Sequence, residues 1–324
     1  MQPFTLIFVL KFYVFSLFQT DDFLSMIQNT GPYDLNIPVQ CGATTTPTAL
    51  VKRALSLGYR TIALNTHVSQ SQFLTKKQAK QKTDDGQSLP DFPLPASVKI
   101  SPEDYPDLAS KGLSPTILTR LTISITSNDF LLHYNKSAIA KQYDILAINI
   151  PNAACLLSLL KSGFRWDIAT FSSDGDPTAG VKWSRKLYYE CVEKNIYFEL
   201  QYSPMIRDST ERRHVISQGH VYHSVGKSRN ILITSGARTP MELRAPGDVA
   251  NLGFLLGLSE NQGKDSVGVK CWSLVKSATG RRMGPFQVRI EKLDQAPSEE
   301  NEESDGDESS EESSDKDSDM ETDN

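Results

Sequence analysis

The chain has 324 residues, of which 39% are hydrophobic and 23% are charged, so it buries a sizeable core and is not a wholly disordered protein. The formal net charge of −5 conceals two opposite regions. Residues 291–324 hold 16 Asp or Glu and two Lys, a net charge of −14. The body of the chain, residues 1–290, therefore has a net charge of +9. A basic body fits a polyanionic partner, although solubility alone also accounts for a surplus of this size.

Residues 1–31 form an atypical apolar extension. Their run FTLIFVLKFYVFSLF is shorter than the roughly 20 residues of a membrane span and is interrupted by Lys11. It also lacks the basic start and the small-residue cleavage site of a signal peptide. We expect the working protein to start at Met26 and to have no contact with a membrane. A secretory or anchor segment is the alternative.

Seven short apolar runs follow, separated by helical patterns in the rhythm of repeated βα units. Near-continuous apolar strands indicate a parallel sheet covered by helices on its faces. Over residues 32–290 we therefore predict an α/β domain, a distorted TIM-like (β/α) barrel with about seven parallel strands. An open doubly wound sheet is the alternative. The predicted strands are 33–39, 61–67, 117–125, 143–150, 167–172, 197–203 and 230–236.

Two stretches fall outside this rhythm. Residues 70–115 are rich in Lys, Gln, Asp, Ser and Pro, which predicts a mobile insertion after the second strand. Residues 291–324 are acidic and Ser-rich, which predicts a disordered tail. Its serines Ser298, Ser304 and Ser310 precede acids and resemble acidophilic-kinase sites. An unmodified, solubilising tail is the alternative.

Residues for catalysis are sparse where barrel enzymes place them, at the carboxyl ends of the strands. His67 is the one histidine at a predicted strand end, whereas a metal hydrolase needs several converging ligands. We expect Asp34 to pair with a cation in the core. The four cysteines are far apart and indicate buried thiols in a reducing compartment. No catalytic residue, metal site or cofactor is predicted.

Arginine recurs near strand ends instead. In FELQYSPMIRDSTERRHVIS (198–217), Asp208 is the predicted N-cap of a helix and Glu211 completes a capping-box pattern. The pattern repeats in ARTPMELR (237–244), with Thr239 as N-cap. Two adjacent helix N-termini with guanidinium groups favour a phosphate-bearing ligand, and local pairing with acids is the alternative for each residue. The candidates are Arg207, Arg212, Arg213, Arg238 and Arg244.

Two further predictions concern the core. Arg120 lies inside the apolar run ILTRLTISI, and an arginine in a core strand needs a partner, so a structural ion pair and a ligand contact are both open. The apolar positions of DVANLGFLLGL are expected to pack against the sheet. They are Val249, Leu252, Phe254, Leu255, Leu256 and Leu258.

Three blocks, ILTRLTI, YSPMIRDSTERR and ITSGARTPMELRAPGDVANLGFLLGLSE, resemble the 30-kDa protein subunit family of eukaryotic and archaeal ribonuclease P, shared in eukaryotes with ribonuclease MRP. The resemblance runs over about residues 33–284 and leaves out both ends of the chain. It implies a barrel similar to the polymerase and histidinol phosphatase superfamily, whose metal-binding His-x-His corresponds here to Asp34-Leu35-Asn36. The implied function is that of a non-catalytic, RNA-binding subunit that supports 5′-leader removal from precursor tRNA by a catalytic RNA.

The resemblance also implies partners and a location. The partners are the catalytic RNA of ribonuclease P/MRP and other protein subunits, among them a small alpha–beta subunit. Whether precursor tRNA is a direct partner is left open. The expected location is the nucleus and nucleolus. By motif, the family's basic positions map onto Arg120, Arg207, Arg212, Arg213, Arg238 and Arg244. The alternatives are a metal-dependent phosphoesterase on the same barrel and a protein–protein scaffold whose arginines face acidic residues of a partner.

Overall fold

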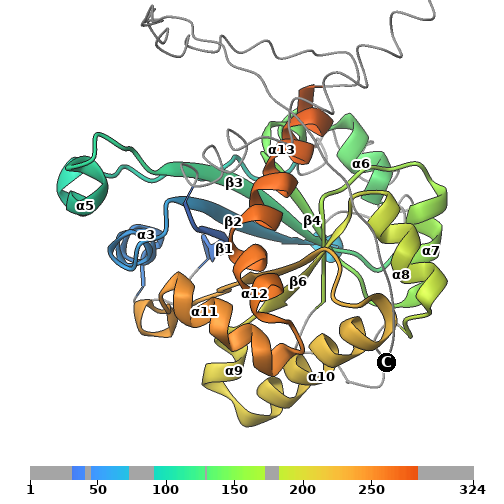
Figure 1. Ribbon diagram of the computed structural model, residues 1–324. Coiled ribbons are helices and arrows are strands. Elements are labelled where there is room, and N and C mark those ends of the chain that lie inside the picture. Colours follow the sequence, from blue (N-terminus) through green and yellow to red (C-terminus); the bar gives the residue numbers. More distant parts are fainter. Residues whose placement is uncertain (1–30, 41–44, 73–90, 128–129, 172–181, 284–324) are drawn as a thin grey trace, which may run out of the picture. The chain divides into compact units, whose positions relative to one another are not determined.

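The computed structural model describes residues 31–40, 45–72, 91–127, 130–171 and 182–283 (Figure 1). The predictions for the apolar extension, Met26, Cys41, the acidic tail and its serines lie outside this part of the chain. None of the helices in it combines the length and the apolar character that a membrane span needs.

The described core is a sheet of seven parallel strands whose spatial order follows the order along the chain. All seven predicted strands are present, most of them shifted or shortened by one to three residues. The strands are β1 (Tyr33–Pro38), β2 (Thr61–Ser69), β3 (Thr116–Ser124), β4 (Ile145–Asn149), β5 (Ile168–Thr170), β6 (Tyr197–Gln201) and β7 (Ile231–Thr234).

Contacts between the first and last strands nearly close the sheet into a barrel. The Gly236 N–H donates to the carbonyl of Asn36 at 3.0 Å, and the Ser235 N–H donates to the Asp34 carboxylate at 3.1 Å. The prediction of a TIM-like barrel with seven parallel strands is therefore confirmed, and the open doubly wound sheet is wrong.

Helices follow the strands and cover the outside of the sheet, as parallel strands require (Figure 1). Several begin at a side-chain cap, for example Thr46 before Pro47, Asn152 and Ser184. The α-helices are α3 (Pro47–Ser56), α5 (Pro106–Ala109), α6 (Phe130–Lys136), α7 (Ala153–Lys161), α8 (Arg185–Glu193), α9 (Ser203–Arg207), α10 (Ser209–Gly226), α11 (Pro246–Leu252), α12 (Glu260–Val267) and α13 (Val269–Met283). Single 3-10 turns are η1 (Gln70–Gln72), η2 (Pro102–Asp104), η3 (Ala140–Gln142), η4 (Pro240–Glu242) and η5 (Gly253–Leu256).

The last described helix, α13, packs against the barrel interior. Its Cys271, Leu274 and Ala278 are buried in one cluster with the residues at or near the starts of the strands, such as Tyr33 and Ile145. Alternation along each strand sends every second side chain inward. This apolar cluster therefore fills the N-terminal half of the barrel, with α13 packed against it, and the next inward-facing layer is polar.

Three local predictions meet the structure with different results. The predicted mobile insertion, residues 70–115, lies outside the described chain over 73–90, and its residues 91–115 contain η2 and α5 and place Phe92 in the core. Val249, Leu256 and Leu258 are buried as expected, but Phe254 and Leu255 are 55% and 56% exposed, so their assignment to core packing is wrong. Both lie in the 3-10 turn η5, whose tighter winding turns them outward. Of the described cysteines, Cys191 and Cys271 are buried thiols, and Cys155 is partly exposed.

Candidate nucleic-acid interface

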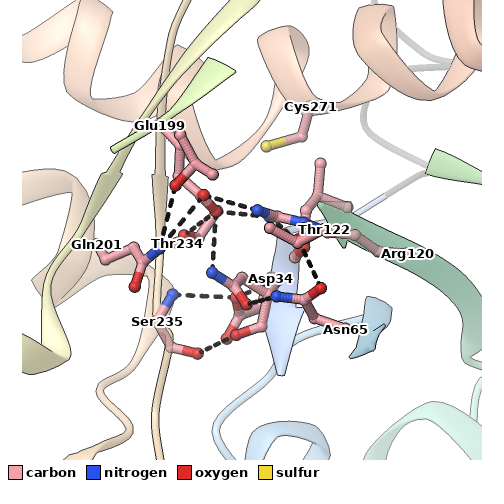
Figure 2. Close-up of polar contacts among 12 residues, drawn as sticks. Asp34, Asn65, Arg120, Thr122, Glu199, Gln201, Thr234, Ser235 and Cys271 are labelled. Atoms are coloured by element: carbon pink, nitrogen blue, oxygen red, sulfur yellow. Dashed lines mark hydrogen bonds and ion pairs between the residues drawn. The ribbon is translucent and has the colours of Figure 1, made fainter. Parts of the chain in front are cut away.

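A bidentate ion pair lies at the centre of the barrel (Figure 2). The two guanidinium nitrogens Nη1 and Nη2 of Arg120 on β3 donate to Oε1 and Oε2 of Glu199 on β6, at 2.6 and 2.7 Å. Both side chains are 0% exposed. Arg120 Nη1 also donates to the carbonyl of Leu35 at 2.9 Å, and Nε donates to the Thr122 hydroxyl at 3.1 Å. The guanidinium is thus surrounded by acceptors, as a buried cation requires.

Amide and hydroxyl groups extend this pair across the barrel (Figure 2). Glu199 accepts from Asn36 Nδ2 at 3.0 Å and from the Thr234 hydroxyl at 2.7 Å. Asn36 in turn accepts from Asn65 Nδ2 at 2.7 Å. The polar layer therefore joins strands β1, β2, β3, β6 and β7 through consecutive hydrogen bonds.

Electrostatics explains why Glu199 is charged in this position. Burial by itself raises the pKa of the Glu199 carboxyl, but the charge and hydrogen bonds of Arg120, together with the hydrogen bond from Thr234, hold that pKa below its ordinary value. Arg120 is therefore a structural residue, and its inclusion among RNA-contacting residues is corrected, since a side chain with no exposed surface cannot reach a phosphate. Glu199 is not among the residues predicted from the sequence. An acid in the middle of the predicted strand YFELQYS is the signal for it.

Asp34 behaves differently from the prediction that it pairs with a cation. Its Oδ1 accepts from the backbone N–H groups of Asn36 and Ser235, at 3.2 and 3.1 Å. Its Oδ2 is buried and has no hydrogen-bond partner in the described part of the chain. Burial raises the pKa of Asp34, against the lowering by its hydrogen bonds with Ser235 and Asn36. The cation of the core pairs with Glu199 instead.

The carboxyl ends of the strands carry no obvious metal centre. Within the described residues, no three His, Cys, Asp or Glu side chains lie together in a way that could hold a metal ion. The strand-end histidine, His67, has its ring Nε2 2.8 Å from the Ser124 hydroxyl.

The arginines that follow β6 and β7 gather around two junctions at the carboxyl end of the barrel. After β6 the chain forms the short helix α9, which ends at Arg207, and then α10 with Asp208 as N-cap. The Asp208 carboxylate accepts from the N–H groups of Thr210 and Glu211, so the predicted N-cap is confirmed. After β7 a helical turn starts at the predicted residues, with Thr239 at the N-cap position and Pro240 first in the turn, but it is the single 3-10 turn η4 and the Thr239 side chain does not cap it. Pro246 starts the next helix only a few residues later.

Glu242 ties the two junctions together. It is 8% exposed and forms an ion pair with Arg207 at 3.2 Å. It also accepts from the backbone N–H of Arg238 at 2.9 Å and from the Thr239 hydroxyl at 3.2 Å. Arg207 has a second carboxylate, that of Glu211, at 3.7 Å. For Arg207, the alternative prediction of local pairing with acids is therefore confirmed.

The remaining four arginines keep their charge uncompensated. Arg212 Nε donates to the carbonyl of Met205 at 2.7 Å, and Arg244 Nη1 donates to the carbonyls of Met241 and Leu243 at 2.7 and 3.0 Å. These contacts orient a guanidinium without neutralising it. Arg213 and Arg238 are exposed. None of the four forms an ion pair with an acid of the described residues. We call Arg207, Arg212, Arg213, Arg238 and Arg244 the arginine face.

These observations define a class of protein: a TIM-like α/β barrel with an ion pair at its centre and exposed arginines at the carboxyl end of its last two strands. The family model described as RNase P subunit p30 matches residues 31–283. The chain belongs to this family, and the ribonuclease P subunit predicted from the sequence is confirmed.

Relatives agree with this assignment. The chain is 31% identical over 259 residues to "Ribonuclease P protein subunit p30" of Mus musculus, over 79% of this chain and 88% of the relative. It is 33% identical over 187 residues to "Probable ribonuclease P protein subunit 3" of Schizosaccharomyces pombe, over 56% of this chain and 74% of the relative.

A solved structure shares the fold. A chain in the cryo-EM structure of archaeal ribonuclease P with mature tRNA superimposes with a TM-score of 0.51 at 13% sequence identity, over 82% of this chain and 100% of that chain. At this identity the match shows the common barrel and no individual contact.

Proposed function

We propose that the chain is a non-catalytic, RNA-binding subunit of ribonuclease P, and of ribonuclease MRP, and that its arginine face contacts the RNA backbone. The observation that carries this proposal is the exposed charge of Arg212, Arg213, Arg238 and Arg244, which form no ion pair with the described residues, in a member of the p30 family. Phosphates accept hydrogen bonds from guanidinium groups in a fixed, charge-assisted geometry. Such contacts position an RNA without reading its sequence.

The barrel interior supports a structural rather than a catalytic role. The guanidinium of Arg120 is held at the centre of the barrel, beneath the strand ends where barrel enzymes assemble their metals and bases. Asn36, Asn65 and Thr234 are already committed to the Glu199 network. The rival function, a metal-dependent phosphoesterase on this barrel, predicts a stoichiometric metal and turnover by the isolated protein. We expect neither.

Partners and location follow from the same role. We propose that the chain assembles with the catalytic RNA and with other protein subunits, including a small alpha–beta subunit, and that it helps to position precursor tRNA for removal of the 5′ leader. We also propose that it resides in the nucleus and nucleolus. Fluorescence microscopy of the tagged native protein tests the location, and exclusion from the nucleus would contradict it.

Binding of the catalytic RNA at increasing salt tests the role of the arginine face. The triple variant Arg212→Ala, Arg213→Ala, Arg238→Ala loses none of the ion pairs among the described residues, so the fold should be intact. Loss of three phosphate contacts should lower the slope of log K against log salt concentration by about 2 to 3, and the affinity at 0.1 M salt on the order of a hundredfold.

Arg207→Ala is the matched control, because two carboxylates already compensate Arg207. We expect a smaller loss of affinity for this variant. If the triple variant bound RNA like the wild type but no longer assembled with the protein subunits, the arginine face would be a protein–protein surface and the proposed RNA contact would be wrong.

A further inference from the structure

A second basic site lies away from the arginine face. A cleft of about 440 Å³ opens between the C-terminal ends of α6, α7 and α13, the helices labelled in Figure 1. Four cationic side chains line it, namely Lys141, Arg165, Arg281 and Arg282. A cavity of this volume lies within the range of small-molecule sites, about 300–1,000 Å³, and is large enough for one nucleotide.

Two of these cations have structural partners. Arg281 pairs with Asp167 at 2.9 Å and is only 11% exposed, and Arg282 pairs with Asp144. Asp144 and Asp167 immediately precede strands β4 and β5, so these two pairs fasten α13 to the barrel. Arg281 and Arg282 therefore have a structural role in holding α13 on the barrel.

The other two cations, Arg165 and Lys141, have no such structural ion pair among the described residues. Arg165 is exposed and forms no ion pair within the described residues. Lys141 donates one of its three N–H groups to the carbonyl of Asn135 at 2.8 Å and likewise has no carboxylate partner there. Beside the two ion pairs, Arg165 and Lys141 give the cleft two further positive charges that form no ion pair with the described residues.

An aromatic wall completes the cleft. Phe164 and Tyr134 both line it and pack edge to face, with ring centroids 5.1 Å apart. Phe164 is partly exposed, next to the exposed Arg165 in sequence. A cationic rim beside an aromatic surface is the combination that accepts an unpaired nucleotide, since the base packs on a ring and the phosphate meets a cation.

The cleft and the arginine face lie at opposite ends of the barrel. Lys141 and Arg165 precede β4 and β5, whereas the arginine face follows β6 and β7. In a barrel of parallel strands, all N-terminal ends lie at one end and all carboxyl ends at the other. With a rise of about 3.3 Å per residue, five-residue strands such as β4 and β6 hold the two basic sites at least about 15 Å apart.

We infer that this cleft binds an unpaired RNA nucleotide, with Arg165 and Lys141 on the phosphates and Phe164 against the base. The inference rests on the proposed function and deepens it. The barrel then bridges two separate segments of RNA, one at each end. Because an aromatic ring packs on any base, we expect binding in the cleft to be selective for single strands rather than for a sequence.

Binding of a fluorescent 12-nucleotide oligouridylate by the full chain, titrated across salt concentrations, tests this inference. We expect Lys141→Ala with Arg165→Ala to lower the salt slope by about 1.4 and the affinity on the order of tenfold at 0.1 M salt. Lys186→Ala with Lys264→Ala removes two exposed lysines outside the cleft and should change neither. A 12-base-pair RNA duplex should be affected less by the Lys141 and Arg165 changes than the single strand.

Ultraviolet cross-linking locates the base. We expect cross-linked uridine on the tryptic peptide 162–165, which contains Phe164, and its loss in Phe164→Leu, which keeps an apolar filler and removes the ring. An unaltered melting temperature in each variant shows that folding is intact.

The outcomes separate this inference from the proposed function. If the cleft variant bound oligouridylate like the wild type, while the arginine-face triple variant lost affinity for the catalytic RNA, the cleft inference would be wrong and the proposed function would stand. No cross-link at 162–165, or no binding of oligouridylate by the wild type, would also overturn it. Loss of a protein subunit from the assembled complex with unchanged RNA binding would make the cleft a protein contact.

Discussion

Arginine has opposite roles inside the barrel and at its rim. Arg120 is 0% exposed, and Glu199, Leu35 and Thr122 accept all the hydrogen bonds that the structure shows for it. Arg212 and Arg244 instead hold their guanidinium groups on backbone carbonyls and keep a net charge at the surface. A buried arginine must be neutralised by the fold, whereas an exposed one is free to neutralise a ligand.

The same comparison separates Arg207 from the other four residues of the arginine face. Arg207 is bound by Glu242 and Glu211, so it joins α9 to η4 and has less charge left for a ligand. The neighbouring arginines carry the binding potential. Sequence motif alone does not distinguish these residues, because the partner Glu242 is 35 positions away.

The largest effect is expected when the buried ion pair of Arg120 and Glu199 is broken. Glu199→Gln keeps the shape of the side chain and removes its charge, leaving Arg120 buried without a counter-ion. We expect it to lower the free energy of unfolding by about 3–5 kcal/mol, measured by urea denaturation. Arg120→Met combined with Glu199→Leu should cost less than Glu199→Gln alone, because no charge remains buried. A double variant less stable than the single one would contradict this account of the ion pair.

The second prediction concerns Asp34, a buried acid that pairs with no cation of the described residues. Burial raises the pKa of Asp34, so the folded state holds this proton more tightly than the unfolded chain. The associated stability is complete below the unfolded pKa, about 3.9, and is lost as the pH rises through the folded pKa. Asp34→Asn cannot ionise and keeps an oxygen for the N–H groups of Asn36 and Ser235. We expect it to raise the unfolding free energy by about 1–2 kcal/mol at pH 7, with a gain that shrinks as the pH falls toward 4.

Asn36→Asp is the matched control for this prediction. It removes the hydrogen-bond donor to Glu199 and places a second negative charge beside it, so it should destabilise the protein at pH 7. Equal stability of wild type and Asp34→Asn across this pH range would show that the unpartnered oxygen costs nothing.

The third prediction asks whether the exposed arginines bind RNA through their charge or through their bidentate geometry. Arg212→Lys with Arg213→Lys keeps both charges and loses the planar fork of donors. We expect the salt slope of RNA binding to be unchanged and the affinity to fall about threefold, because phosphate contact depends first on charge. A lysine variant as weak as the alanine variant would show that the bidentate geometry, rather than the charge, holds the RNA.

The smallest effect is expected at η5. Phe254→Ser with Leu255→Ser changes two side chains that are 55% and 56% exposed, so the unfolding free energy should change by no more than about 0.5 kcal/mol per site. Thermal unfolding of Leu256→Ser, a fully buried neighbour, provides the contrast. A large loss of stability in the Phe254 and Leu255 variant would restore the original prediction that they pack in the core.

Local signals in the sequence determined the strands, the capped helix starts and the positions of the arginines. Alternating and continuous apolar runs report directly on which side of a strand or helix is buried, so seven strands and the barrel were predictable. The N-cap Asp208 was also predictable, because a cap bonds to backbone groups only two and three residues away. The three sequence blocks that resemble the p30 family were sufficient to predict the family.

Only the tertiary structure decided the partners. Arg120 and Glu199 are 79 residues apart, and Arg281 and Asp167 are 114 apart, so no local pattern connects them. The prediction that Asp34 holds the core cation was wrong for this reason, since closure of the barrel brings β3 opposite β6. The tight winding of η5 and the 3-10 turn η4 were likewise set by packing. Which arginines are neutralised, and which are left for a phosphate, depends on distances that exist only after the chain has folded.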